Sequence, residues 1–97
     1  SAIEDLHRGR ELYARHGEGV GEYFLDSLFS DIDSLLLYAG IHQKVFGYHR
    51  LLAKRFPYAV YYLIEKDVAV VYRVLDLRRN PSFLRDSLPS SDQTGQE

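Results

Sequence analysis

Apolar residues recur at helical spacing in the first part of this chain and alternate along strands in the second. Ser1, with Glu4 three residues later, predicts a capped helix start. The helix predicted from there has one face made of Ile3, Leu6, Arg10 and Tyr13. Glycines at positions 17, 19 and 21 predict that this helix breaks and the chain turns.

A second helix is predicted from about residue 21 to residue 38. Its apolar stripe consists of Phe24, Leu28, Ile32 and Leu35, and it is widened by Leu25, Phe29 and Leu36. Four polar side chains lie largely off that stripe and are expected to be solvated, namely Asp26, Ser30, Asp31 and Asp33. Gly40 is expected at the C′ position, where it ends the helix. The short link predicts that the two helices form an antiparallel hairpin.

From about Lys44 the pattern becomes that of strands. Residues 44–53 predict one irregular strand, with Gly47 at a bulge or bend. Residues 58–64 and 68–75 are rich in β-branched and aromatic residues and flank a polar turn, which predicts a hairpin. Because both faces of residues 58–64 are apolar, this strand is expected inside the sheet, paired on both sides.

The chain is predicted to close with a short helix and a polar tail. Asn80 is suited to the N-cap and Pro81 to the first helical position of a helix reaching Leu88. Residues 89–97 are poor in apolar side chains and are expected to be disordered. Residues 1–88 therefore form one α+β domain, in which a helix hairpin packs on a three-stranded antiparallel sheet. Such a sheet leaves two open edges.

Composition narrows the classes of protein to be considered. The 97 residues include no cysteine, which excludes disulfides, thiolate metal sites and a cysteine nucleophile. No apolar stretch has the length of a membrane span and no signal peptide opens the chain, so a cytoplasmic location and no membrane partner are expected.

Charge is distributed unevenly along the chain. Residues 1–41 contain three basic and eight acidic side chains, whereas residues 42–85 contain nine basic and three acidic ones. A basic sheet beside an acidic helix pair indicates an anionic partner for the sheet. The alternative is that a small domain segregates charge without any functional reason.

Seven basic residues are expected on or beside the sheet: His49, Arg50, Lys54, Arg55, Arg73, Arg78 and Arg79. Cationic side chains of this kind can hold phosphates. Nearby aromatic side chains could stack on unpaired bases, although the tyrosines among them fit a core role better: Tyr48, Tyr58, Tyr61, Tyr62 and Phe83. Arg73 is expected mid-strand on the face of Val71 and Leu75, where it needs an acceptor such as Asp76 or an acid of the helices.

Other chemistry finds little support in the sequence. The four histidines have no metal-ligand spacing, no glycine-rich loop follows a strand, and no serine–histidine–aspartate order can be argued. Asp31 and Asp33 are two residues apart on a helix and do not share a face. We therefore expect no metal and no cofactor.

Three segments together resemble the RelE/ParE superfamily of bacterial type II toxin–antitoxin toxins. Residues 2–13 look like the first helix of that family, and residues 56–62 look like the entry to its central strand. Residues 70–75, followed by Arg78-Arg79-Asn80-Pro81, look like its last strand and rim. The resemblance covers nearly all of residues 1–88, but the strand that usually precedes the first helix is absent here.

The resemblance implies a toxin that a cognate antitoxin neutralises by wrapping the sheet and the helix hairpin, in a hetero-oligomer or alongside a homodimer. Phe83 stands where the RNA-cleaving branch tends to have tyrosine, and Asp76 where histidine is frequent, so the chain looks closer to the ParE-like branch, which acts on DNA gyrase without chemistry of its own. Target binding is then expected at Arg73, Arg78, Arg79 and Phe83. The alternative is a ribosome-dependent mRNA endonuclease using Arg50, Lys54, Arg73 and Arg79, and a further one is an inactive interaction domain.

Overall fold

The computed structural model describes residues 1–90, and two packed helices open the fold. Helix α1 (Ala2–Ala14) begins at the predicted capping box, in which Ser1 and Glu4 bond each other's backbone. Helix α2 (Val20–Asp33) follows, and a single turn, α3 (Leu35–Tyr38), continues beyond it. The second helix predicted for residues 21–38 is therefore two elements. Gly40, at φ +97°, lies one residue past the C-cap of α3, as expected.

Helices α1 and α2 approach closely because glycines lie between them. A Cβ at Gly9 would lie 2.4 Å from the ring of Phe24, and one at Gly21 would lie 2.7 Å from the carbonyl oxygen of Arg10. Gly21 was predicted to help end the first helix and form the turn, but it lies inside the first turn of α2. The turn between the helices uses Gly17 and Gly19, which have positive φ.

The sheet is antiparallel and its strands follow the order of the chain. The strands are β1 (Lys44–Val45), β2 (Tyr48–Leu52), β3 (Tyr58–Glu65) and β4 (Val68–Asp76). The α+β class and the position of β3 between two neighbours are confirmed. The single strand expected over residues 44–53 is two strands, because Phe46 and Gly47 both adopt positive φ and form a tight turn. The sheet thus has four strands rather than three.

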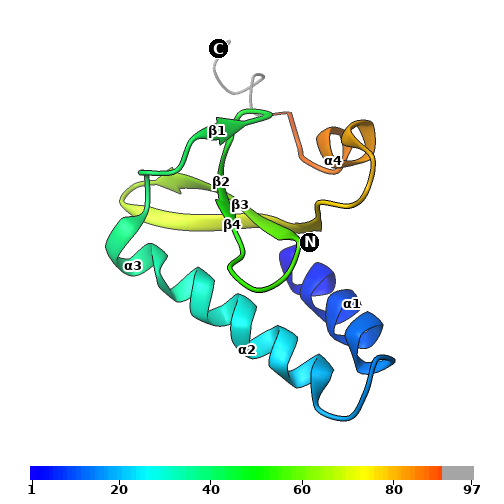
Figure 1. Ribbon diagram of the computed structural model, residues 1–97. Helices are drawn as coiled ribbons and strands as arrows, with labels where there is room; N and C mark the ends of the chain where they lie inside the picture. The colour runs from blue at the N-terminus through cyan, green and yellow to red at the C-terminus, as the bar shows by residue number, and fades with distance from the viewer. Residues whose placement is uncertain (91–97) are drawn as a thin grey trace.

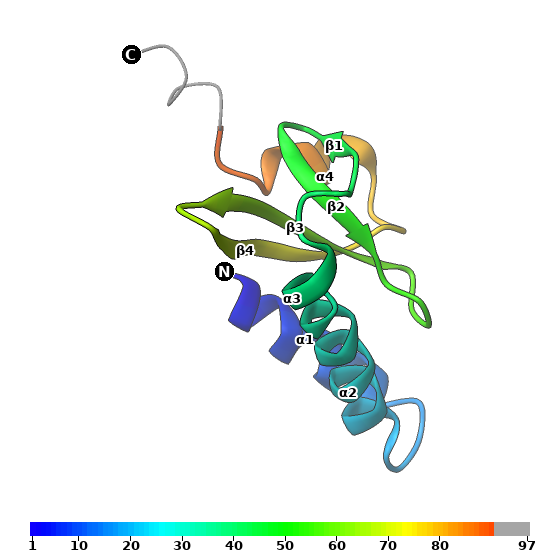
Figure 2. The same ribbon diagram turned by 90° about the vertical axis from the view of Figure 1, so that its left-hand side faces the viewer.

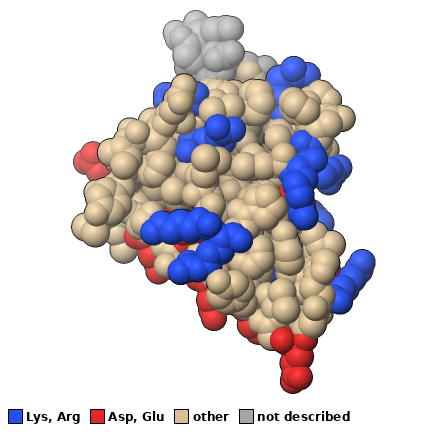
Figure 3. Space-filling model, viewed as in Figure 1, with Lys and Arg blue, Asp and Glu red and all other residues tan. Residues whose placement is uncertain are grey.

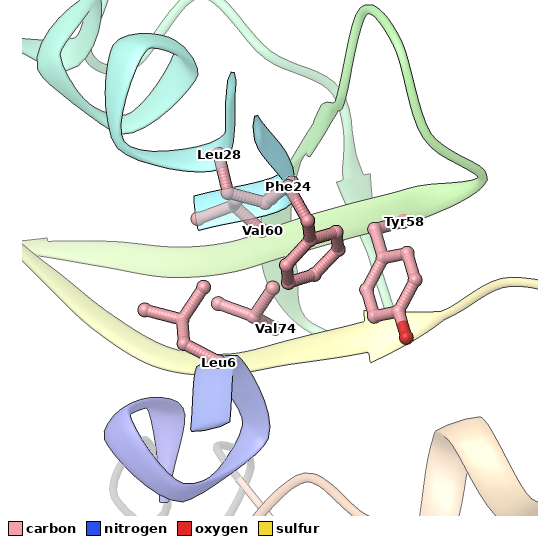
Figure 4. Packing of buried hydrophobic residues seen from close by; sticks show 6 residues of the cluster. All are labelled: Leu6, Phe24, Leu28, Tyr58, Val60 and Val74. Atoms are coloured by element: carbon pink, nitrogen blue, oxygen red, sulfur yellow. The ribbon is translucent and has the colours of Figure 1, made fainter. Parts of the chain in front are cut away.

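Both faces of the sheet are covered, which explains the two-sided apolarity of β3. On one face, α1 and α2 pack against Tyr58, Val60 and Val74 through Leu6, Phe24 and Leu28 (Figure 4). On the other face lies α4 (Pro81–Asp86), which starts at the predicted N-cap Asn80 (Figures 1 and 2). The buried residues of this second face are Tyr48, Ala59, Tyr61, Leu75, Leu84 and Leu88. The four central residues of the predicted stripe are confirmed, with Ile32 partly buried and Leu35 buried, but the widening of the stripe by Phe29 and Leu36 is wrong, because both side chains are exposed.

A β-bulge interrupts the pairing of β3 with β4. Tyr61 pairs with Arg73 but Tyr62 pairs with Val71, so Tyr72 is the extra residue. Strict alternation had predicted Val71, Arg73 and Leu75 on one face, and this is wrong. Val71 packs with the core beneath the helices, whereas Leu75 belongs to the cluster beneath α4. The bulge turns Arg73 toward α1.

Two further expectations concern the ends and the surface of the chain. Most of the tail predicted for residues 89–97 lies outside the described residues. Within residues 1–90, the structure contains no helix that is long and apolar enough to span a membrane. On the face shown in Figure 3, most Asp and Glu side chains lie toward the helix hairpin and most Lys and Arg side chains lie above it, in line with the segregation in the sequence.

Candidate functional site at the sheet rim

A cavity of about 320 Å³ opens where α1 passes the end of β4 and the segment leading into α4. Charged side chains from all three segments line it. The residues that matter here are Asp5, Arg8, Glu11, Arg15, Arg73, Asp76, Arg79 and Phe83. The cavity therefore lies at the rim that the sequence predicted for target binding.

The most buried part of this cavity is an ion pair between the first helix and the last strand. Arg73 donates to both carboxylate oxygens of Asp5, with Nε–Oδ2 and Nη2–Oδ1 distances of 2.7 and 2.8 Å. The backbone N–H of Val74 also donates to Asp5, at 2.9 Å, and Arg73 Nη1 donates to the carbonyl of Ser87 at 2.7 Å. Arg8 adds a bond to Asp5 Oδ1 at 2.9 Å. Arg73 therefore pairs with an acidic residue of the helices, which is one of the two kinds of acceptor that the sequence analysis expected.

Burial and these hydrogen-bond donors have opposite effects on the pKa of the Asp5 carboxyl. Burial by itself raises the pKa of this group. The hydrogen bonds from Arg73 and Val74, together with the charge of Arg73, outweigh burial and hold the pKa of Asp5 below its ordinary value. Asp5 is therefore ionised at neutral pH, and it neutralises Arg73.

The remaining rim residues are more exposed. The guanidinium of Arg78 donates twice to Asp76, at 2.9 and 2.7 Å, and once to the hydroxyl of Tyr13, at 3.2 Å, and the backbone N–H of Arg78 also donates to Asp76. Burial opposes ionisation of Asp76, but the bonds from Arg78 lower the pKa of this carboxyl. Arg79 stacks on Phe83, with its guanidinium carbon 3.7 Å from the ring centre. Arg79 and Phe83 thus present one joint cation–aromatic surface.

Some of the predicted residues meet at the rim and others do not. Arg73, Arg79 and Phe83 line the cavity, and Arg78 lies beside it on Asp76. Arg50 belongs to β2, next to Tyr61 of β3, and Lys54 lies in the β2–β3 loop. Neither Arg50 nor Lys54 lines the cavity. The four residues expected for an endonuclease therefore do not all meet in this cavity, although Arg50 and Arg73 flank the same residue of the central strand, Tyr61.

Two cationic residues that line the cavity, Arg8 and Arg15, were not among the residues predicted for the site. Arg8 lies on α1 and Arg15, seven residues later, is its C-cap residue, so the two lie about two turns apart on one face with Glu11 between them. Their spacing could have revealed the shared face. Only the packing of α1 on β4 shows that this face borders the rim.

The expectation that Asp31 is solvated is wrong. Only 3% of Asp31 is exposed, and its carboxylate accepts the backbone N–H of Lys54 at 3.1 Å. It ties α2 to the β2–β3 loop, a structural task that helical spacing cannot reveal. The tyrosines on β2 and β3, in contrast, lie in the core as expected: Tyr48, Tyr58, Tyr61 and Tyr62.

The tyrosine that lines the cavity is poorly suited to proton transfer near neutral pH. Burial, aided by the charge of Asp76, raises the pKa of Tyr58 to about 12. No imidazole is among the residues that line the cavity. Across residues 1–90, no cluster of three or more His, Cys, Asp or Glu side chains could hold a metal ion.

Histidines instead gather with Tyr62, away from the rim. The Tyr62 hydroxyl accepts the Gly40 N–H at 2.9 Å and lies 2.5 Å from His42 Nδ1. His49 stacks on the ring of Tyr62, with the ring centres 5.0 Å apart, and its Nδ1 donates to the carbonyl of His42 at 2.6 Å. Burial, followed by the charge of His49, lowers the pKa of His42. This cluster anchors the segment between α3 and β1.

A second, apolar depression of about 630 Å³ lies between the end of α2, α3 and the β3–β4 hairpin. We call it the apolar groove; its lining residues include Leu36, Leu37, Ile64, Val68 and Ala69. Leu36 and Leu37 are 87% and 81% exposed. Asp33 and Asp67 are the charged residues among its lining.

Comparison with protein-family models, with curated proteins and with solved structures finds no match to this chain. Its function is therefore inferred from the fold, from the rim and from the segments described in the sequence.

Proposed function

We propose that this protein is the toxin of a type II toxin–antitoxin pair, of the ParE-like kind, and that it acts on DNA gyrase by binding rather than by chemistry. The segments that resemble the family support the assignment, and the α+β arrangement of a helix hairpin on an antiparallel sheet agrees with it. The observation that carries the choice of mechanism is the ion pair between Asp5 and Arg73.

An RNA-cleaving site needs a cation whose charge is available to the phosphate as negative charge develops on it. Arg73 does not meet this need, because its Nε and Nη2 donate to the carboxylate of Asp5 and its Nη1 donates to the carbonyl of Ser87. Phe83 brings no hydroxyl to the same cavity. Arg73 thus serves to position the rim, and target contact is assigned to Arg79, Phe83 and Arg78.

Arg79 and Phe83 have the character of an interface anchor. Arginine and large aromatic residues contribute most to protein interfaces when water is excluded around them. The stacked pair is already held in place by the N-cap of α4, where Asn80 accepts the N–H of Phe83 at 3.0 Å. Such preorganisation lowers the entropic cost of binding.

Neutralisation by the antitoxin is assigned to the apolar groove. Exposed leucines of α3 offer apolar area, and Asp33 and Asp67 favour basic side chains on the bound segment. The antitoxin would be an extended or helical segment of that composition, in a hetero-oligomer with the toxin. A gyrase target also places the protein in the cytoplasm.

The test compares the two leading activities on the purified protein. We expect inhibition of gyrase supercoiling without cleavage of ribosome-bound mRNA. Arg79→Ala and Phe83→Ala should each weaken inhibition about tenfold or more, which corresponds to ~1.4 kcal/mol or more of binding free energy. Arg85→Ala is the matched control, because Arg85 is also an exposed cation of α4 but does not line the cavity.

The endonuclease alternative is favoured by one observation, the presence of Arg8, Arg15 and Arg79 around the same cavity. They could hold RNA phosphates without Arg73. Cleavage of mRNA on ribosomes that Arg15→Ala abolishes would replace the proposal by this alternative. If the protein is inert in both assays but its antitoxin still binds it, the remaining alternative is an inactive interaction domain.

A further inference from the structure

Two arginines of the rim cavity, Arg15 and Arg79, differ from the other two in their contacts. Arg8 and Arg73 both form an ion pair with Asp5. Arg15 and Arg79 line the same cavity, but within the described part of the chain the side chain of neither one forms an ion pair or a hydrogen bond. Their N–H groups are therefore available to an anion that enters the cavity.

The two arginines reach the cavity from different elements. Arg15 is the C-cap residue of α1, whereas Arg79 ends the turn after β4, where its backbone N–H donates to the carbonyl of Asp76 at 3.1 Å. The charge of Arg79 acts on the Asp76 carboxylate, but the side-chain hydrogen bonds to that carboxylate come from Arg78. Arg79 stacks on Phe83 with the face of its guanidinium, so the N–H groups at the edge remain for an acceptor.

The charges around the cavity suit a ligand with one carboxylate better than a chain of phosphates. Four arginines and three carboxylates line the cavity, which leaves one net positive charge. Burial opposes the ionisation of Asp5 and Asp76, but hydrogen bonds from arginines hold the pKa of both below its ordinary value, so both stay charged at neutral pH. Glu11, between Arg8 and Arg15, repels the successive phosphates that a nucleic acid would bring.

The size and the apolar lining of the cavity limit the ligand further. Its volume of about 320 Å³ is at the lower end of the range for ligand pockets, which suits one or two side chains rather than a folded element. Leu12 and Phe83 line it and are 38% and 37% exposed. Leu12 lies one helical turn before Arg15, and Phe83 lies against Arg79, so each of the two arginines has an apolar neighbour.

We propose that Arg15 and Arg79 together bind one Asp or Glu side chain that stands next to an apolar residue in an exposed segment of the target protein. Guanidinium groups bind carboxylates through paired, charge-assisted hydrogen bonds, which gives both strength and geometric selectivity. Arg15 thereby selects an acidic segment, while Leu12 and Phe83 contact its apolar neighbour. The inference rests on the proposed function in taking the rim as the surface that meets the target, and it adds the chemistry of the segment that is bound.

The test uses a peptide of defined sequence, Gly-Ser-Leu-Glu-Leu-Ser-Gly, blocked at both ends, and a control peptide in which Gln replaces Glu. NMR titration of the labelled protein measures both affinities. We expect the Glu peptide to bind about tenfold more tightly, and Arg15→Gln and Arg79→Gln should each abolish that preference. Arg85→Gln, at an exposed position of α4 outside the cavity, is the matched control and should retain it. Equal affinities of the two peptides for the unmodified protein would overturn the inference.

Two further measurements separate this inference from its alternatives. An oligouridylate that binds more tightly than the Glu peptide, and that Arg15→Gln no longer binds, would overturn the inference in favour of a nucleic acid ligand. Gyrase inhibition without any preference for the Glu peptide would overturn the inference and leave the proposed function standing. A preference for the Glu peptide that depends on Arg15, without gyrase inhibition, would support the acidic segment and exclude gyrase as the target.

Discussion

At the scale of single residues, the strongest constraint is the carboxylate of Asp5. It is 5% exposed and accepts bonds from Arg73, Val74 and Arg8. A buried charge that loses its partner is costly, whereas removing both charges together is much less so. The pair therefore specifies how α1 docks on β4.

We expect Asp5→Ala to lower the free energy of unfolding by about 3 kcal/mol, because it leaves Arg73 without its partner. Arg8→Ala, which removes an exposed contact to the same carboxylate, should cost less than about 1 kcal/mol. Urea unfolding measures both. The double variant Asp5→Leu/Arg73→Met should be more stable than the sum of its two single variants predicts, because it removes both charges together. If the effects of Asp5→Leu and Arg73→Met on the free energy of unfolding are strictly additive, the ion pair does not couple α1 to β4.

The histidine cluster predicts a dependence on pH. The pKa of His42 in the folded protein is below its ordinary value of 6.5, so folding disfavours the protonated ring. The stability that this group contributes is complete above about pH 6.5 and is lost as the pH falls through the folded pKa. Unfolding in urea at pH 7.5 and pH 5.5 should show a decrease that His42→Gln reduces. His7→Gln, at an exposed position of α1, is the control and should leave the decrease unchanged.

At the scale of elements, the helix hairpin depends on two glycines that permit close approach. Alanine normally stabilises a helix relative to glycine. Gly21→Ala should do the opposite, because its Cβ meets the carbonyl of Arg10 at 2.7 Å, and we expect a loss of about 2 kcal/mol by thermal or urea unfolding. Gly19→Asn should change little, since asparagine tolerates the positive φ there and no atom lies within 4 Å of the new Cβ. Stabilisation by Gly21→Ala would show that the helices can separate without cost.

Elements with a local signal were predictable from the sequence. The caps at Ser1 and Asn80 and the central strand β3 follow from side chains acting on their own neighbourhood. The β-bulge at Tyr72 was not predictable, since its register is set by the partner strand. For the same reason, the sequence indicated Arg79 and Phe83 at the rim but not Arg8 and Arg15, whose place depends on how α1 packs.

At the scale of the whole molecule, substitutions in the apolar groove should affect the proposed binding of a partner without affecting the stability of the fold. Leu36 is almost fully exposed, so Leu36→Ser should change the free energy of unfolding by less than about 0.5 kcal/mol. If the proposed function holds, the same change should weaken neutralisation by the antitoxin, measured as loss of growth rescue on coexpression. Ser30→Ala, on the exposed side of α2, is the control. Unimpaired rescue by Leu36→Ser would exclude this groove as the antitoxin site.

The contact of Arg73 with Asp5 and Ser87 also limits when the protein can become active. It joins Asp5 to Arg73, which lies 68 positions further along the chain, and Arg73 to Ser87. On a translating ribosome, the buried carboxylate of Asp5 has no partner until the segment that contains Arg73 and Ser87 has been released. Contacts so distant in sequence form late in folding. The rim should therefore form only after Ser87 has left the ribosome, and on the function proposed above this delay would give an antitoxin already present in the cell time to meet each toxin molecule as it folds.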